Sequence, residues 1–196
     1  MSNDPTLSCQ CGSLTATLRG ASGDNGNHGM CYCLDCQAFA RHLGQLDRIA
    51  NAAGGTEIFQ TQPHRIAITS GIEHLALLRL SKKGINRWFA SCCNTPLCTT
   101  PGPPKVAFAG MLVANITASQ TALGPIRFRY KRESALQPVK EPQGSALRFV
   151  ARTFASIAAE RLSGRWKDTP LFGADGRSIV KPYVLSASER TAAYTR

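Results

Sequence analysis

The sequence contains no run of about 18 apolar residues, the length that a helix needs to cross a membrane, so no membrane-spanning segment is expected. Residues 1–5 also lack a basic segment followed by an apolar stretch, so no secretory signal peptide is predicted. Without such a signal we expect a cytoplasmic, reducing location. Cysteine thiols stay free to bind metal there and do not pair as disulfides.

Acidic residues are scarce, because 12 Asp and Glu stand against 23 Lys and Arg and give a net charge of +11. Residues 1–125 carry 9 Lys and Arg against 6 Asp and Glu, whereas residues 126–196 carry 14 against 6. A basic C-terminal third could contact nucleic acid, a membrane surface or an acidic small molecule. The same excess also describes a solvated face that keeps a protein soluble, and this is the favoured interpretation.

The chain has no internal repeat, and its 196 residues suit one domain with an appendage, or two small domains. Apolar and polar residues alternate in several short segments, which is the pattern of half-buried strands. These segments are 13–18, 56–61, 65–69, 75–80, 86–91, 106–112 and 126–130. Their spacing predicts a mainly β protein, with an antiparallel β domain over residues 1–132.

A proline-containing linker at residues 133–144 is expected to separate this domain from a helical C-terminal appendage, residues 145–196. Ser145 is placed to cap a helix that Gly164 ends. One face of that helix carries an apolar stripe of Leu147, Val150, Phe154 and Ile157. We expect the stripe to pack on the β domain, and the alternative is that it pairs with a second copy of the chain.

The last part of the chain contains two more large apolar residues, a turn motif and a helix-capping motif. Leu171 and Phe172 need to be covered by other side chains. Residues 175–176, Asp-Gly, predict a hairpin turn. Ser186 followed three residues later by Glu189 predicts a capping box that opens a short last helix.

The eight cysteines fall into three clusters: Cys9-Gln10-Cys11, Cys31-Tyr32-Cys33-Leu34-Asp35-Cys36, and Cys92-Cys93 with Cys98 a little further on. Short C-x-C and C-x-x-C repeats let neighbouring thiolates converge on one soft cation, and zinc takes four such ligands in a tetrahedron. A disulfide scaffold is the less favoured interpretation, because a chain of this length does not need one. The clusters therefore indicate metal binding.

The first and third clusters are complementary halves of one site. On a strand, Cys9 and Cys11 would point to the same face. Cys92 and Cys93 could supply the other two ligands if a turn at residues 93–96 aims both inward. A closed four-cysteine zinc site would clip a loop of about 80 residues and contribute folding free energy.

The middle cluster is different, because Cys31, Cys33 and Cys36 supply three thiolates within six residues. Three protein ligands with an open fourth position are typical of catalytic zinc, where water or substrate completes the tetrahedron. His28 or Asp35 could instead close the site. The sequence thus predicts about two zinc ions per chain, in unequal sites.

The three motifs, in this order, resemble those of the glutathione-dependent formaldehyde-activating enzyme family, which includes centromere protein V. The resemblance covers residues 7–115. It implies an Mss4-like β fold with a structural zinc, held by Cys9, Cys11, Cys93 and one neighbour. It also implies a catalytic zinc on the middle cluster.

The chain departs from the family pattern at two positions, which is typical of a divergent branch. Tyr32 stands where the family usually has the histidine of Cys-His-Cys, and Ala90 stands where it usually has a metal-binding cysteine. Ala90 cannot bind metal. The fourth structural ligand is therefore Cys92, Cys98 or absent.

The resemblance and the open site together predict a zinc-dependent carbon–sulfur lyase-like protein that acts on adducts of a small thiol with an aldehyde. The thiol, glutathione by resemblance, would be the fourth ligand of the middle zinc, which would lower the thiol pKa. Arg41, His42 or Arg87 could pair with its carboxylates.

The alternative is a non-catalytic, zinc-stabilised binding module whose basic C-terminal third contacts nucleic acid or a protein partner. Arg127, Arg129 and Lys131 alternate on one face of an expected strand, as phosphate contacts require. Phe128 and Tyr130 fall on the opposite face and are expected in the core. Redox or metal handling is a third, less favoured interpretation.

Overall fold

The computed structural model describes residues 4–117 and 120–195, and two β-sheets dominate it. The smaller sheet has the order β10-β1-β2-β5, and the larger has the order β11-β3-β4-β9-β8-β7-β6-β12. The strands are β1 (Thr6–Ser8), β2 (Thr15–Leu18), β3 (Asn27–Cys31), β4 (Thr56–Thr61), β5 (Ile66–Ser70), β6 (Leu75–Arg79), β7 (Asn86–Ala90), β8 (Thr95–Thr100), β9 (Ala109–Leu112), β10 (Ile116–Thr117), β11 (Phe128–Tyr130) and β12 (Tyr183–Val184). The expectation of a mainly β protein is confirmed.

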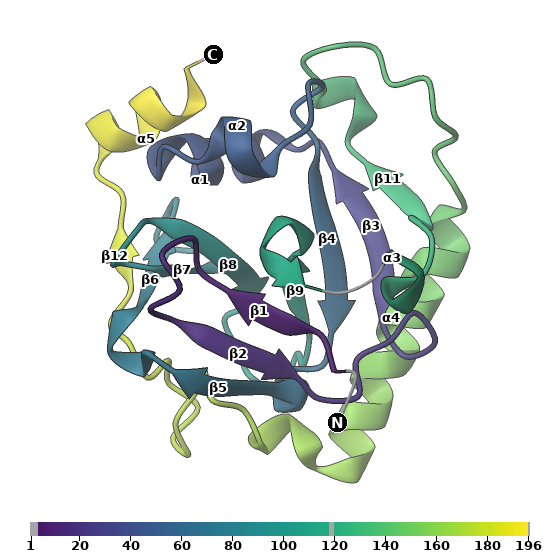
Figure 1. Cartoon of the computed structure of the whole chain (residues 1–196), viewed down its shortest axis with the longest axis vertical. Coiled ribbons are helices and arrows are strands. Elements are labelled where there is room, and N and C mark those ends of the chain that lie inside the picture. Colours follow the sequence, from purple (N-terminus) through teal and green to yellow (C-terminus); the bar gives the residue numbers. More distant parts are fainter. Residues whose placement is uncertain (1–3, 118–119, 196) are drawn as a thin grey trace.

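The helices lie around the sheets. They are α1 (Leu34–His42), α2 (Leu46–Ile49), α3 (Gln120–Leu123), α4 (Ala146–Ser163) and α5 (Ala187–Tyr194), with short 3-10 turns at Pro63–Arg65, Ile72–His74, Val113–Asn115, Arg132–Ser134 and Arg165–Lys167. Figure 1 shows α1, α2 and α5 together at one end of the molecule, and α4 along the side formed by β3 and β11. No helix in the described ranges is long and apolar enough to cross a membrane.

Strand pairing is antiparallel except at the two edges of the larger sheet, where β11 joins β3 and β12 joins β6 in parallel. Strand β4 has the predicted bounds. Strands β3 and β8 were not predicted. Strand β3 begins Asn-His-Gly, which are poor strand formers. Strand β8 is buried at all six positions and so lacks the alternation of a half-buried strand.

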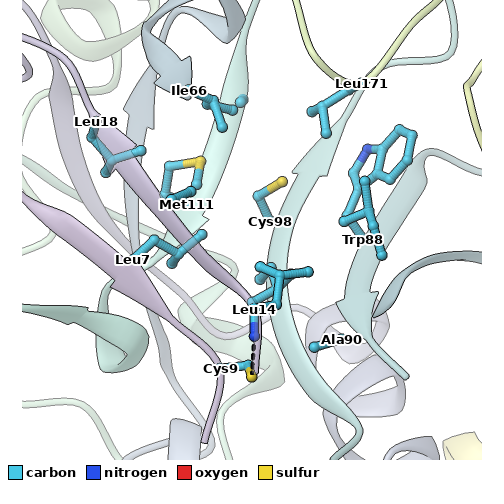
Figure 2. Close-up of a cluster of buried hydrophobic side chains, with 14 of the residues drawn as sticks. Leu7, Cys9, Leu14, Leu18, Ile66, Trp88, Ala90, Cys98, Met111 and Leu171 are labelled. Atoms are coloured by element: carbon cyan, nitrogen blue, oxygen red, sulfur yellow. Dashed lines mark hydrogen bonds between the residues drawn. The ribbon is translucent and has the colours of Figure 1, made fainter. Parts of the chain in front are cut away.

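The main core lies between the two sheets. Figure 2 shows Leu7, Leu18 and Ile66 of the smaller sheet around Met111 of the larger one, and Trp88 belongs to the same cluster. Trp88 and Met111 are fully buried, and the indole N–H of Trp88 donates to Thr100 Oγ1 at 3.0 Å. This core fixes how the sheets face each other, and so where their turns meet.

Helix α4 begins and ends where the sequence predicted. The Ser145 side chain accepts a hydrogen bond from the Arg148 backbone N–H at 3.3 Å, and Gly164 ends the helix with a φ of 76°. That left-handed conformation is unfavourable for residues with a Cβ.

Helix α4 packs on the larger sheet through the face opposite to the predicted one. Phe149 is 2% exposed, whereas Leu147 is 80% and Phe154 65% exposed. The buried face is mostly polar: Asn27 Nδ2 donates to the Phe149 carbonyl at 2.9 Å, and His64 Nδ1 lies 2.7 Å from Glu160. The prediction that the apolar stripe docks on the sheets is wrong, because polar side chains on β3 and beside β4 match the polar face.

The chain after α4 runs back across both sheets. Leu171 and Phe172 are buried in the main core, and β12 extends the larger sheet beside β6, so this region is not only helical. The predicted capping box is present, because Ser186 and Glu189 bond each other's backbone N–H groups. Helix α5 packs on α1, where Arg41 Nη1 donates to the carbonyl of Ala193 at 2.7 Å.

We expect Phe149→Ala to lower the free energy of unfolding by about 3–5 kcal/mol, because it removes a buried ring that packs edge-on against Tyr130 at 5.1 Å. The matched change Leu147→Ala, on the exposed face of the same helix, should stay within about 0.5 kcal/mol. Urea unfolding at constant m-value measures both. Equal losses of unfolding free energy in the two variants would contradict the packing of the Phe149 face of α4 on the larger sheet.

Candidate metal centres

Four cysteines converge where the two sheets meet. Cys9 and Cys11 lie in the turn between β1 and β2, and Cys92 and Cys93 lie in the turn between β7 and β8. Their sulfur atoms all lie within 4.8 Å of one another. The sequence placed Cys9 and Cys11 on a strand. This is wrong, because β1 ends at Ser8 and both thiols are aimed by a turn.

The sulfur spacing fits a tetrahedral metal. Four Zn–S bonds of about 2.3 Å require sulfurs about 3.8 Å apart. The separations are 3.6 Å for Cys9–Cys11, 3.8 Å for Cys9–Cys92, 3.3 Å for Cys11–Cys92 and 3.8 Å for Cys92–Cys93. These four thiols could therefore hold a metal ion as they stand.

The local backbone explains the convergence. Asn94 has a positive φ of 53°, a conformation that asparagine tolerates better than most residues, and it closes the turn that presents Cys92 and Cys93. The backbone N–H of Leu14 donates to Cys9 Sγ at 3.2 Å, and hydrogen bonds with the Ser13 side chain and backbone lower the pKa of Cys11 to about 6. The lowered pKa favours the thiolate of Cys11, the form that binds metal.

The structure decides between the alternatives for the fourth member of this cluster. Cys92 joins Cys9, Cys11 and Cys93. Cys98 lies on β8 inside the main core, 3% exposed, and Figure 2 shows it among apolar side chains. Burial raises the pKa of Cys98 to about 12, so it behaves as a small apolar residue. All eight cysteines lie in the described ranges, and all are free thiols.

The second cluster lies at the junction of β3 and α1. Cys31 is the last residue of β3, Cys33 is the N-cap of α1, and Cys36 lies in its first turn. Cys36 Sγ is 3.7 Å from Cys31 Sγ, and the Cys36 backbone N–H donates to Cys33 Sγ at 3.4 Å. A helix N-terminus stabilises negative charge, so the junction favours a thiolate.

Charge is shared unequally among these three thiols. Hydrogen bonds from Cys31 and Cys36, then the Cys36 backbone N–H and the positive charge of Arg87, lower the pKa of Cys33 to about 2. Hydrogen bonds with Cys33 and Cys36, together with burial, raise the pKa of Cys31. These contacts therefore favour the thiolate form at Cys33.

In the described part of the chain no fourth Cys, His, Asp or Glu joins this cluster. Both ring nitrogens of His28 are already engaged, with the Gly124 carbonyl and Glu57 Oε1, each at 2.7 Å. Asp35 instead accepts a hydrogen bond from the Tyr194 hydroxyl at 2.5 Å. Neither of the two residues proposed to close the site does so.

The cluster lies on the wall of a cavity of about 340 Å³. Of the three cationic candidates, Arg87 lines this cavity. Arg41 donates a hydrogen bond to a backbone carbonyl of α5, and neither Arg41 nor His42 lines the cavity. Other parts of the wall come from β4, β8, β9, β11 and α4, and from Phe108 just before β9. The large side chains among them are Ile58, Phe108, Tyr130 and Phe149. Sequence reasoning missed these wall residues as a group, because only the fold brings them together.

The arginines of the predicted basic strand are engaged within the chain. Arg127 Nη2 donates to the Gly23 carbonyl at 2.9 Å, and Arg129 Nη1 donates to the Pro142 carbonyl at 2.8 Å. Phe128 and Tyr130 pack with Phe149, as expected of core residues. These arginines therefore hold loops against the sheet.

We expect the purified protein to contain about two equivalents of bound metal per chain. Cys11→Ser should lose about one equivalent and much of the stability, because it opens the cluster that joins the two sheets. The matched control Cys98→Ala should keep both equivalents, since its thiol lies outside both clusters. Elemental analysis with thermal unfolding measures this. Less than about one equivalent after reconstitution of the unmutated protein would contradict both metal sites.

Comparison with known proteins places the chain among its relatives. No curated protein matches it. A crystal structure of a Rhodobacter sphaeroides protein from Northeast Structural Genomics is 16% identical, with a TM-score of 0.41, and the similarity covers 64% of this chain and 98% of that one. Residues 1–181 match a family of unknown function, DUF6151. The chain that carries these two cysteine clusters therefore belongs to the DUF6151 family.

Proposed function

We propose that this protein is a zinc-dependent carbon–sulfur lyase-like enzyme with an Mss4-like fold, a divergent relative of the glutathione-dependent formaldehyde-activating enzymes and centromere protein V. Zinc at Cys9, Cys11, Cys92 and Cys93 would be structural. Zinc at Cys31, Cys33 and Cys36 would be catalytic. The observation that carries the proposal is that the three-thiol cluster lies on a cavity wall, whereas the four-thiol cluster is complete.

Three thiolates would leave a bound zinc ion with one exchangeable position. At that position the zinc would act as a Lewis acid that lowers the pKa of a substrate thiol. The reaction proposed is reversible cleavage of a hemithioacetal. The carbon–sulfur bond breaks with its electron pair returning to sulfur, the hydroxyl proton leaves to water, and a carbonyl forms. No oxidant or reductant is needed.

The chain itself supplies an oriented donor and a partly enclosed cavity. Tyr130 lines the cavity, and burial raises the pKa of its hydroxyl to about 12, so the hydroxyl keeps its proton at neutral pH. It can therefore donate a hydrogen bond to the hydroxyl or carbonyl oxygen of a substrate. Phe108 and Phe149 exclude water from one side, which strengthens that bond.

The alternative, a non-catalytic binding module that contacts nucleic acid or protein, has weaker support. The arginines proposed to contact phosphate donate instead to backbone carbonyls at 2.8–2.9 Å. A structural role alone also gives no reason for a cavity beside three thiols. The proposed thiol chemistry further suits the reducing, cytoplasmic location expected from the sequence.

We expect the zinc-replete protein to accelerate exchange between formaldehyde and glutathione, measured by NMR exchange spectroscopy. Cys36→Ser should abolish this acceleration and release about one metal per chain, with the fold largely retained. Cys11→Ser should instead lose much of the stability. Equal losses in melting temperature for the two variants would favour the binding module. The same holds if the unmutated protein accelerates the exchange of formaldehyde neither with glutathione nor with any other small thiol.

A further inference from the structure

The walls of the cavity beside Cys31, Cys33 and Cys36 are largely apolar. Four of its large side chains are Ile58, Ile85, Phe108 and Phe149. Ile85 is 44% exposed and stands at the rim, whereas Phe149 is buried. A ligand body in contact with these side chains gains free energy in proportion to the apolar area that it buries. The cavity therefore suits an apolar body.

One cation lines this cavity, and it is nearly inaccessible to solvent. Arg87 lies on β7, is 2% exposed, and shares the cavity wall with Thr99, its cross-strand neighbour on β8. Its guanidinium carbon lies 5.4 Å from the centre of the Phe39 ring. The buried position and the stacked ring together fix the direction of the guanidinium.

The guanidinium of Arg87 makes no hydrogen bond to any described residue. Its Nη2 forms an ion pair with Asp35 Oδ2 at 3.6 Å, too long for a hydrogen bond, and Nη1 is buried without a partner. A buried cationic donor without an acceptor is costly. A carboxylate meets this need well, because it accepts parallel N–H bonds from a guanidinium.

The cavity offers one guanidinium, which can pair with one carboxylate of a ligand. Among the described lining residues, Arg87 is the one cation and Asp35 the one carboxylate. Asp35 is also committed, because its Oδ1 accepts from the Tyr194 hydroxyl. Glutathione brings two carboxylates and an ammonium group, so Arg87 could pair with only one of its three charges.

We propose that the cavity takes a monoanionic thiol with an apolar body, a mercaptocarboxylic acid or its aldehyde adduct, whose carboxylate pairs with Arg87 while its sulfur lies at the Cys31–Cys33–Cys36 cluster. This inference rests on the proposed function and narrows its substrate class. It separates this chain from an enzyme specific for glutathione. Apolar walls, one buried guanidinium and three thiols on the same cavity carry it.

The test compares three thiols on the full-length protein loaded with Co²⁺, whose absorption reports a new sulfur ligand. The probes are 2-mercapto-3-phenylpropanoic acid, its primary amide, and glutathione. The acid and the amide have nearly the same shape and differ in charge. We expect the acid to bind at least about 10-fold more tightly than the amide, and more tightly than glutathione, because it alone offers a charge-assisted bond with an apolar body.

The outcomes separate the inference from the proposed function. If the acid and the amide bind equally, or if glutathione binds most tightly, the inference is wrong and thiol binding at the cluster stands. If none of the thiols changes the Co²⁺ spectrum, both are wrong. Cys36→Ser protein, which keeps the four-cysteine site, supplies the spectral background.

Two arginine variants locate the discrimination. Arg87→Gln should reduce the preference for the acid over the amide to less than about 2-fold, because the glutamine carries no charge. Arg41→Gln, which removes a cation bonded to α5, should keep the preference. If Arg87→Gln does not fold, the comparison of acid and amide on the unmutated protein still decides. An unchanged preference in folded Arg87→Gln protein would overturn the assignment to Arg87.

Discussion

The rest of the structure depends on how the two sheets pack against each other, because this packing brings two turns together, one after β1 and one between β7 and β8. Each turn presents two cysteines. The sulfur of Cys92 lies 3.8 Å from that of Cys9 and 3.3 Å from that of Cys11, although more than 80 residues of chain separate Cys92 from each of them. A metal bound there would constrain the unfolded chain and align the core between the sheets. Cys9 itself belongs both to the cluster and to the core, so packing and metal binding at this point support each other.

The position of the second cluster follows from that arrangement. Strand β3 and helix α1 meet at Cys31–Cys36, which places three thiols near a helix N-terminus. Strand β11 then pairs with β3, and α4 covers them, so that Tyr130 and Phe149 form one wall of the cavity. Strand β7 supplies Arg87 to another wall. The cavity therefore depends on segments from the β strands and from the region after residue 145.

Helix α4 shows that polar complementarity can decide which face of an amphipathic helix is buried. Its buried side carries Glu160, which is 2% exposed and pairs with His64 and Arg165. It also carries Thr153, whose hydroxyl oxygen accepts a hydrogen bond from Asn27 Nδ2 of β3. Each of these groups would be costly to bury without a partner. The sheet supplies the partners, whereas Leu147 and Phe154 find no apolar counterpart on it and remain outside.

The sequence by itself determined what depends on neighbours in the chain. The alternation at residues 56–61, the caps at Ser145 and Ser186, and the ligand-like spacing within each cysteine cluster are local properties, and all are present in the structure. Only the tertiary structure decided that Cys92 and not Cys98 completes the first cluster, that β8 is a central strand, and that Arg87 rather than Arg41 lines the cavity. The physical reason is that burial on both faces removes the alternation that marks a strand. In addition, the meeting of distant side chains depends on strand pairing, which local pattern does not encode.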